Sequence, residues 1–180
     1  EICMLQLHPP PNPLPSRERE YFWKSFVMTT GVMLMSHREY PDHPRVGVGA
    51  VVLREGRVLL VRRGAAPAQG LWAIPGGGLR LGETLQAGAE REILEETGII
   101  IRAGAPLFAC DSFERDGSGR IRFHYVIVDV TADYLSGEVK GADDALEARW
   151  VSPAEIRGLP VTKTTLKLLT QIGFIPSPES

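Results

Sequence analysis

"GGGLRLGETLQAGAEREILEETGI", residues Gly76 to Ile99, is the stretch from which the rest of the chain can be interpreted. Three glycines open it and predict a loop. Thr84 is a residue type that caps helix N-termini, and Gly98 is typical of a helix C-terminus. The stretch therefore predicts a helix over residues 85–97 that follows a glycine-rich loop.

Glutamates crowd this predicted helix. At about 100° per residue, Glu92, Glu95 and Glu96 fall within an arc of roughly 100°, whereas Glu90 points elsewhere. Each like-charge pair at ~5 Å would cost roughly 3 kcal/mol before solvent screening, at an effective dielectric near 20. A hard divalent cation would remove the repulsion, and the Gly76–Gly78 loop could reach both the metal and phosphates. A solvated acidic helix is the alternative interpretation.

The segments around this helix predict both strands and helices. Two β-branched runs in RVGVGAVVLREGRVLLVRR flank a turn and indicate a hairpin. LFACDSF, RFHYVIVDV and EARWV are typical of strands, and the segment from Ser152 to Glu155 is typical of a helix start. A final helix is expected over about residues 164–172. Hairpins mixed with helices favour an α/β or α+β sandwich around a mixed sheet.

Composition narrows the classes of function. The chain has 180 residues, 43% of them hydrophobic, and a net charge of −2, which fits one globular domain. Twenty basic against 22 acidic residues leave no polybasic surface for long nucleic acid or an anionic membrane. Cys3 and Cys110 form neither a disulfide framework nor a metal-binding pair, so we expect a cytoplasmic protein.

Residues 1–43 differ from the rest of the chain. Five prolines in HPPPNPLPSRERE favour extended backbone, and we expect an N-terminal extension ahead of a folded domain over residues 44–176. The apolar run that follows the prolines is too short to span a bilayer, and Lys24 interrupts it, so no membrane partner is expected. An arm that docks on the domain through Phe22, Trp23 and Phe26 is the alternative.

The spacing of charges and glycines in the opening stretch is specific. It runs Gly77, five residues, Glu83, seven residues, Arg91-Glu92-Ile93, Leu94, Glu95-Glu96, Thr97, Gly98 and Ile99. This spacing is the Nudix box, G-x5-E-x7-R-E-U-x-E-E-x-G-U with U aliphatic, so the chain resembles a Nudix hydrolase. GVGAVVLREGRVLLVRR, LWAIPGG, HYVIVDV and DDALEARWV also resemble the bacterial ADP-ribose pyrophosphatase-like branch. The resemblance covers roughly residues 45–174.

The resemblance implies an α/β/α sandwich and a metal-dependent hydrolase that cleaves a nucleoside diphosphate linked to another group. Glu92 and Glu96 would be metal ligands, Glu95 a ligand or its neighbour, and the Gly76 carbonyl would add an oxygen. Mg²⁺ or Mn²⁺ is the implied cofactor. The bound cations would neutralise the diphosphate and lower the pKa of a bound water.

Further catalytic roles follow from the same resemblance. Glu83 and Arg91 would pair and hold the loop against the helix. Glu92 is one candidate for the base that takes the proton from water, and Asp143, Asp144 and Glu147 are others. For these three acids a capped turn and a solvated strand face are equally good interpretations.

Substrate contacts are expected around the same loop. Arg62 and Arg63 alternate along a strand, so only one of them can face the site and meet a phosphate. The expected substrate-binding set is Arg62, Arg63, Gly77, Gly78, Asp144 and Glu147. Core packing is expected for Trp72, Phe108, Phe123 and Tyr125, with stacking on a base the alternative for the last three.

The substrate itself stays open between two classes. Residues 111–119 contain neither the proline nor the tyrosine that mark particular Nudix branches. ADP-ribose or a related nucleotide sugar is favoured, and a nucleoside triphosphate pyrophosphohydrolase that removes oxidised nucleotides is the alternative. A non-catalytic nucleotide sensor is less favoured because every charged position of the box is present. The expected partner is a small-molecule nucleotide, and a homodimer is left open.

Overall fold

A computed structural model of the chain describes residues 38–140 and 145–177. Most of the predicted N-terminal extension lies outside the described residues. The elements, in chain order, are β1 (Arg45–Arg54), β2 (Arg57–Arg63), β3 (Trp72–Ala73), β4 (Gly76–Gly78), α2 (Leu85–Thr97), β5 (Ile100–Arg115), β6 (Ile121–Ser136), β7 (Ala145–Val151), α3 (Pro153–Ile156) and α4 (Lys163–Gln171).

The strands form one mixed sheet, as the sequence predicts. Its order is β3-β2-β1-β6-β5, with β4 paired to β1 and β7 paired to β2. β1 and β6 run parallel, whereas the other strand pairs are antiparallel. β1 is therefore central: it contacts β2 and β4 along one edge and β6 along the other.

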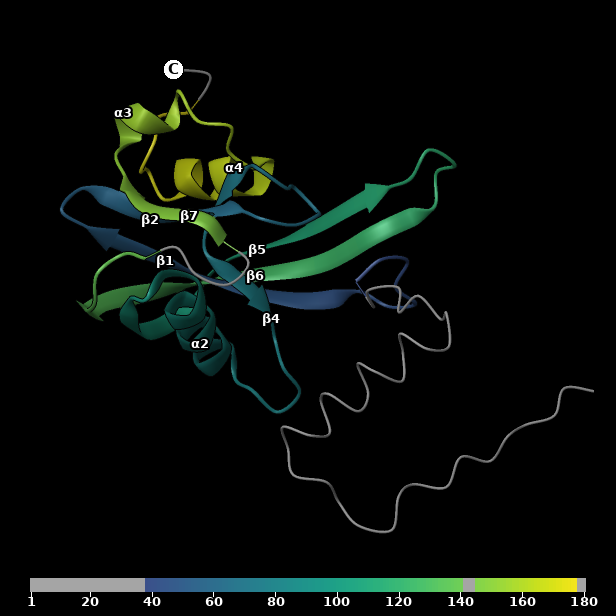
Figure 1. Cartoon of the computed structure of the whole chain (residues 1–180), viewed down its shortest axis with the longest axis horizontal. Helices are drawn as coiled ribbons and strands as arrows, with labels where there is room; N and C mark the ends of the chain where they lie inside the picture. Colours follow the sequence, from purple (N-terminus) through teal and green to yellow (C-terminus); the bar gives the residue numbers. More distant parts are fainter. Residues whose placement is uncertain (1–37, 141–144, 178–180) are drawn as a thin grey trace, which may run out of the picture. The chain divides into compact units, whose positions relative to one another are not determined.

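Helices cover both faces of the sheet, which confirms the predicted α/β/α sandwich. Figure 1 shows α2 on one side and α3 and α4 on the other. Alternate residues of β1 serve the two cores because successive side chains of a strand point to opposite faces. Val48, Ala50 and Val52 pack with Ala89 and Ile93 of α2. The second core lies on the α4 side and contains Val51, Leu60, Trp72, Phe108, Leu168 and Leu169.

The hairpin of β5 and β6 is longer than the sequence predicts. Its strands were expected over residues 107–113 and 122–130, but they span 16 residues each and reach beyond the rest of the sheet (Figure 1). The added part of β5 includes Gly104 and Pro106, residue types that are uncommon inside strands. The sheet accommodates them by register shifts between Ala103 and Phe108, so pairing continues past both residues.

The ends of the helices follow local signals. The Ser152 hydroxyl accepts from the Glu155 amide while the Glu155 side chain accepts from the Ser152 amide, which is the predicted capping box. α4 begins one residue before the predicted start, at Lys163, because the Thr162 hydroxyl caps it by accepting from the Thr165 amide.

Candidate active site

α2 occupies the residues predicted for it and carries the acidic side chains. The Thr84 hydroxyl accepts from the Ala87 amide at the N-terminus, and Gly98 ends the helix in the left-handed region with φ 71°. Its buried residues include Gly88, Ala89 and Ile93. A side chain at Gly88 would meet Leu79 at 2.8 Å. The small residues of α2 thus let the segment after the glycines pack closely on the helix.

The three glycines form a strand, not the predicted loop. β4 pairs with β1 in antiparallel register, Gly47 with Gly78 and Gly49 with Gly76. Without side chains, the backbone can approach both β1 and α2. A Cβ at Gly76 would collide with the Val48 carbonyl, and one at Gly77 would lie 2.5 Å from the Glu92 carboxylate. Pairing with β1 fixes the backbone of Gly76–Gly78 more firmly than a loop would.

Two carboxylates of α2 are directed at this strand. Glu96 Oε2 accepts a hydrogen bond of 2.8 Å from the Gly76 amide. The Glu92 carboxylate lies in the space that a Gly77 side chain would fill, and its side chain is 14% exposed. Both groups therefore lie on the backbone of β4, where the sequence placed the candidate metal site.

Arg91 joins the helix to the segment before it. Its guanidinium donates to both carboxylate oxygens of Glu83, at 2.7 and 2.8 Å, and to the Gly78 carbonyl at 3.2 Å. This is the ion pair predicted from the sequence. Hydrogen bonds from Arg91 and from the Arg80 amide lower the pKa of Glu83 from 4.5 to about 2. Glu83 is thus ionised over the whole physiological range and holds Arg91 in one orientation.

Arginines offset the charge of the acidic face, so the predicted repulsion does not stand alone. Arg91 Nη1 also donates to Glu92 at 2.6 Å and to Glu95 at 3.1 Å. Arg80 Nη2 donates to Glu95 at 3.3 Å. The repulsion expected from the three carboxylates alone is thus reduced by the guanidinium groups of Arg80 and Arg91. A cation is consequently not required to make this helix face stable.

The carboxylates divide into two groups. Glu92 and Glu96 face the glycine strand, whereas Glu95 is turned to Arg80 and Arg91. Among residues 38–140 and 145–177, no three acidic, histidine or cysteine side chains lie close enough together to hold a metal ion. The donor set still fits a hard cation chemically, since Glu92 and Glu96 adjoin bare backbone that can supply a carbonyl oxygen.

The predicted basic contacts lie elsewhere. Arg62 Nε donates to the Gly70 carbonyl and Arg63 Nε to the Pro67 carbonyl, so both hold the loop between β2 and β3. Glu147 is paired with Arg62 across β7 and β2, and its carboxylate lies 3.9 Å from Arg149 Nε. No described contact joins these side chains to α2. Asp143 and Asp144 lie outside the described residues.

The aromatic residues divide as the packing argument predicts. Trp72, Phe108 and Phe123 are buried, and Tyr125 is half-buried. The guanidinium of Arg149 lies over the Trp72 ring at 4.6 Å from its centroid. Trp72 therefore belongs to the core on the α4 side and is not placed to read a substrate.

One buried acid was missed by sequence reasoning. Asp129 lies in β6 with only 6% of its surface exposed, and burial raises its pKa from 3.8 to about 6. The signal was present in HYVIVDV, where a single charge interrupts an apolar run at a position that faces a core. The apolar composition of the run predicted a strand, and its single carboxylate was not considered as a separate feature.

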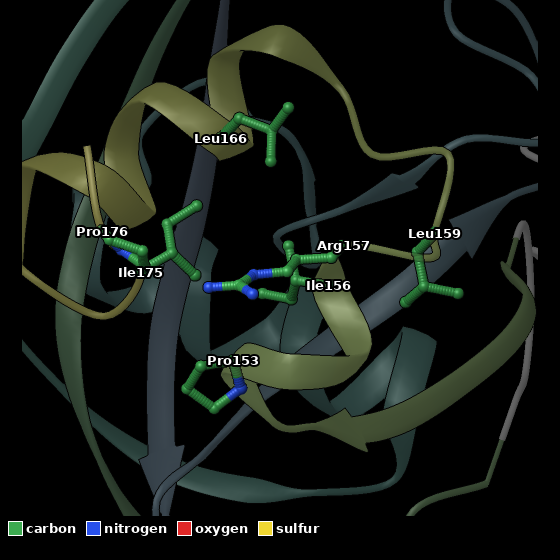
Figure 2. Close-up of a pocket in the computed structure, with 7 residues that line it drawn as sticks. All are labelled: Pro153, Ile156, Arg157, Leu159, Leu166, Ile175 and Pro176. Carbon is green, nitrogen blue, oxygen red and sulfur yellow. The ribbon is translucent and has the colours of Figure 1, made fainter. Parts of the chain in front are cut away.

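A pocket elsewhere in the domain does not contain this chemistry. Figure 2 shows the residues that line a pocket between α3, α4 and the segment after α4. This pocket has a volume of about 230 Å³. It is lined by Pro153, Ile156, Arg157, Leu159, Leu166, Ile175 and Pro176. Its lining contains no acid, so we do not assign the reaction to it. Within the described part of the chain, no helix has the length and apolar character needed to cross a membrane.

Comparisons with known proteins agree with the geometry. The model of the NUDIX domain matches residues 43–170. An ADP-ribose pyrophosphatase of Methanocaldococcus jannaschii is 36% identical over 108 residues, which are 60% of this chain and 62% of that protein. A MutT-like protein of Streptomyces ambofaciens is 46% identical over 61 residues, 34% of this chain and 38% of that protein. The chain thus spans less than two thirds of the length of these relatives.

Solved structures show the same fold. The crystal structure of a MutT NUDIX hydrolase from Burkholderia pseudomallei aligns with a TM-score of 0.59 and 31% identity, covering 73% of this chain and 99% of that one. A MutT protein from Methanosarcina mazei aligns with a TM-score of 0.61 and 25% identity, covering 74% and 96%.

Proposed function

This chain belongs to the Nudix hydrolase family, and we propose that it hydrolyses the diphosphate bond of a nucleotide linked to another group, with Mg²⁺ or Mn²⁺ as cofactor. One observation carries the proposal: the carboxylates of Glu92 and Glu96 both lie on the bare backbone of Gly76 and Gly77. A solvated acidic helix would direct these groups to water. Here they adjoin β4, a strand made of three glycines.

The chain's own residues divide the work. Glu92 and Glu96, with the Gly76 carbonyl, would hold the cation, which when bound neutralises the diphosphate and lowers the pKa of water. Glu92 is the candidate to accept the proton from the attacking water. Glu83 and Arg91 keep β4 against α2, so the carboxylates and the backbone hold a fixed spacing. Glu95 accepts a hydrogen bond from Arg91, which also donates to Glu83 and Glu92, so Glu95 acts as a positioning residue.

ADP-ribose, or a related nucleotide sugar, is the favoured substrate. The support is the relative from Methanocaldococcus jannaschii, which is named ADP-ribose pyrophosphatase and matches 60% of this chain. A pyrophosphohydrolase of nucleoside triphosphates that removes oxidised nucleotides stays the alternative, because the names of the relatives that carry the MutT label do not specify a substrate. The cytoplasmic setting and the homodimer stay predictions.

A hydrolysis screen with and without cation tests the proposal. The substrates are ADP-ribose, sugar nucleotides, dinucleotides and canonical or oxidised triphosphates, each with Mg²⁺, with Mn²⁺ and with excess chelator. We expect product only when a cation is present. Turnover that persists unchanged in excess chelator, or no turnover of any of these substrates, would overturn the proposal.

Two conservative variants of α2 separate a site from an acidic surface. Glu96→Gln keeps an oxygen that can accept from the Gly76 amide, so the fold should be retained, while the lost charge should weaken the cation and lower turnover by orders of magnitude. Glu90→Gln is the matched control, because Glu90 is exposed and only accepts from the Ala103 amide at 2.9 Å. Its turnover should stay within a few-fold of wild type. Equal small losses over a Mg²⁺ titration would contradict the assignment of Glu96.

A further inference from the structure

Asp129 lies on the sheet face opposite α2, and β1 separates it from the glycine strand. Strand pairing places Gly49, Asp129 and Phe108 in one row across β1, β6 and β5. Phe108 packs in the core on the α4 side, so the Asp129 side chain points to that side of the sheet. Gly49 in turn pairs with Gly76 of β4. Asp129 is therefore two strand spacings, about 10 Å, from the candidate active site.

Glycine makes room for this carboxylate. A Cβ on Gly49 would collide with Asp129 Oδ1 and would lie 3.0 Å from the Pro75 carbonyl and 3.3 Å from the Ile74 side chain. The Asp129 carboxylate thus lies over the backbone of β1, beside the segment that leads into Gly76. In the next row, a Cβ on Gly47 would be 3.7 Å or more from its neighbours. β1 therefore offers bare backbone on this face as well.

The described residues offer Asp129 no protein donor. No hydrogen bond or ion pair joins its carboxylate to any residue in the two described segments, although the side chain is only 6% exposed. The titratable groups near this position are the neutral Cys110 thiol, whose pKa is raised by burial and by the charges of Asp129 and Asp111, and the exposed ammonium of Lys167, which lies 5.8 Å from the centre of the Phe108 ring. A buried carboxylate without a donor is costly, whereas a valine would fit the apolar strand. The arrangement is that of an acceptor whose donor comes from a ligand.

We infer that Asp129 is a specificity-determining residue that accepts a hydrogen bond from a donor group of the substrate nucleoside, a ribose hydroxyl or a ring amine. The inference rests on the proposed function, which places the diphosphate at β4. Among the described residues β4 pairs only with β1. Its other edge is unpaired, so a ligand bound along that edge can contact both faces of the sheet. The distance of roughly 10 Å between this edge and Asp129 is within the length of a nucleoside joined to the diphosphate.

The test measures binding in the absence of turnover. ADP-ribose, its hypoxanthine analogue and an analogue without the hydroxyls of the adenosine ribose are titrated into wild type and Asp129→Val by calorimetry, with Ca²⁺ in place of Mg²⁺ and with chromatography of the recovered nucleotide to check that none is hydrolysed. We expect the valine variant to bind ADP-ribose about 10- to 100-fold more weakly, because a charge-assisted hydrogen bond is lost. One of the two analogues lacks the donor, so wild type should bind it about as weakly as Asp129→Val binds ADP-ribose. Asp129→Val should bind that analogue and ADP-ribose equally well. The analogue that behaves in this way identifies the donor as amine or hydroxyl.

Two controls keep the inference separate from folding and from catalysis. Asp133→Asn removes an exposed carboxylate from the same strand and should bind all three nucleotides as wild type does. With Mg²⁺ present, Asp129→Val should raise KM about 10- to 100-fold and change kcat only a few-fold. Unchanged binding by Asp129→Val, equal weakening of all three nucleotides, or no binding by wild type would overturn the inference. Failure of hydrolysis alone would instead count against the proposed function.

Discussion

Replacing Asp129 by asparagine removes a charge from the interior with little change in shape, and its effect on stability depends on pH. Burial raises the pKa of this carboxyl from 3.8 to about 6, because the charged form loses its hydration inside the sheet. Between these values the folded chain binds more protons than the unfolded chain. The stability contributed by the carboxyl is therefore fully present below pH 3.8 and is lost as the pH rises through about 6.

The size of the effect follows from the same two values. The pKa difference corresponds to about 3 kcal/mol of unfolding free energy. The asparagine variant has no carboxyl to ionise at this position, so it should not lose this contribution. From below pH 3.8 to well above pH 6, the difference in unfolding free energy between the variant and wild type should grow by about 3 kcal/mol in favour of the variant.

Urea unfolding over a series of pH values measures this difference directly. Other titrating groups act equally in the two proteins, so they cancel when the two curves are subtracted. Asp133→Asn provides the control, because its carboxylate is exposed and its difference curve should be flat. A constant offset between Asp129→Asn and wild type, or a variant that loses stability relative to wild type as the pH rises, would refute the reasoning.

Three further predictions concern β4 and α2. Gly77→Ala should keep the fold but lower turnover roughly 10²-fold, because its Cβ would displace the Glu92 carboxylate at 2.5 Å. Gly117→Ala, with nothing within 4 Å of its Cβ and in the turn between β5 and β6, should retain activity in the same assay. Glu83→Gln should be less stable than wild type above pH 4.5, and the difference should vanish in chemical unfolding as the pH falls toward 2, because Arg91 lowers the Glu83 pKa to about 2. Saturating Mg²⁺ should raise the melting temperature of wild type more than that of Glu96→Gln, and equal shifts would contradict direct binding.

Local signals predicted α2 almost completely, whereas contacts between distant segments did not follow from them. Thr84 and Gly98 define the helix because capping depends on neighbouring residues. The pairing of Glu83 with Arg91 also followed from the spacing of the box. The strand at Gly76–Gly78 could not be predicted in this way. Three glycines in a row favour a loop, and they form a strand only because they pair with β1.

Charge compensation and burial were the other gaps. The compensation of Glu95 by Arg80 depends on how the segment after β4 folds back over α2, which no periodicity encodes. The burial of Asp129 depends on the parallel pairing of β6 with β1 and on the absence of a side chain at Gly49. Sequence patterns supplied the candidates for the reacting groups of the helix. These patterns could not identify Arg80 and Asp129, whose surroundings form only when distant segments of the chain pack together.

The parallel pairing of β1 with β6 also sets the order in which the domain can be built during synthesis. Gly49 pairs with Asp129, 80 residues further along the chain, whereas β2, β4 and α2 all lie between them. A ribosome that adds about 5–20 residues per second needs several seconds to cover that distance. During this interval β1 has its nearby partners on one side and an open apolar edge on the other, which favours aggregation. Substitutions that delay the docking of β6 should therefore reduce the yield of folded protein from cells while leaving the turnover of each folded molecule unchanged.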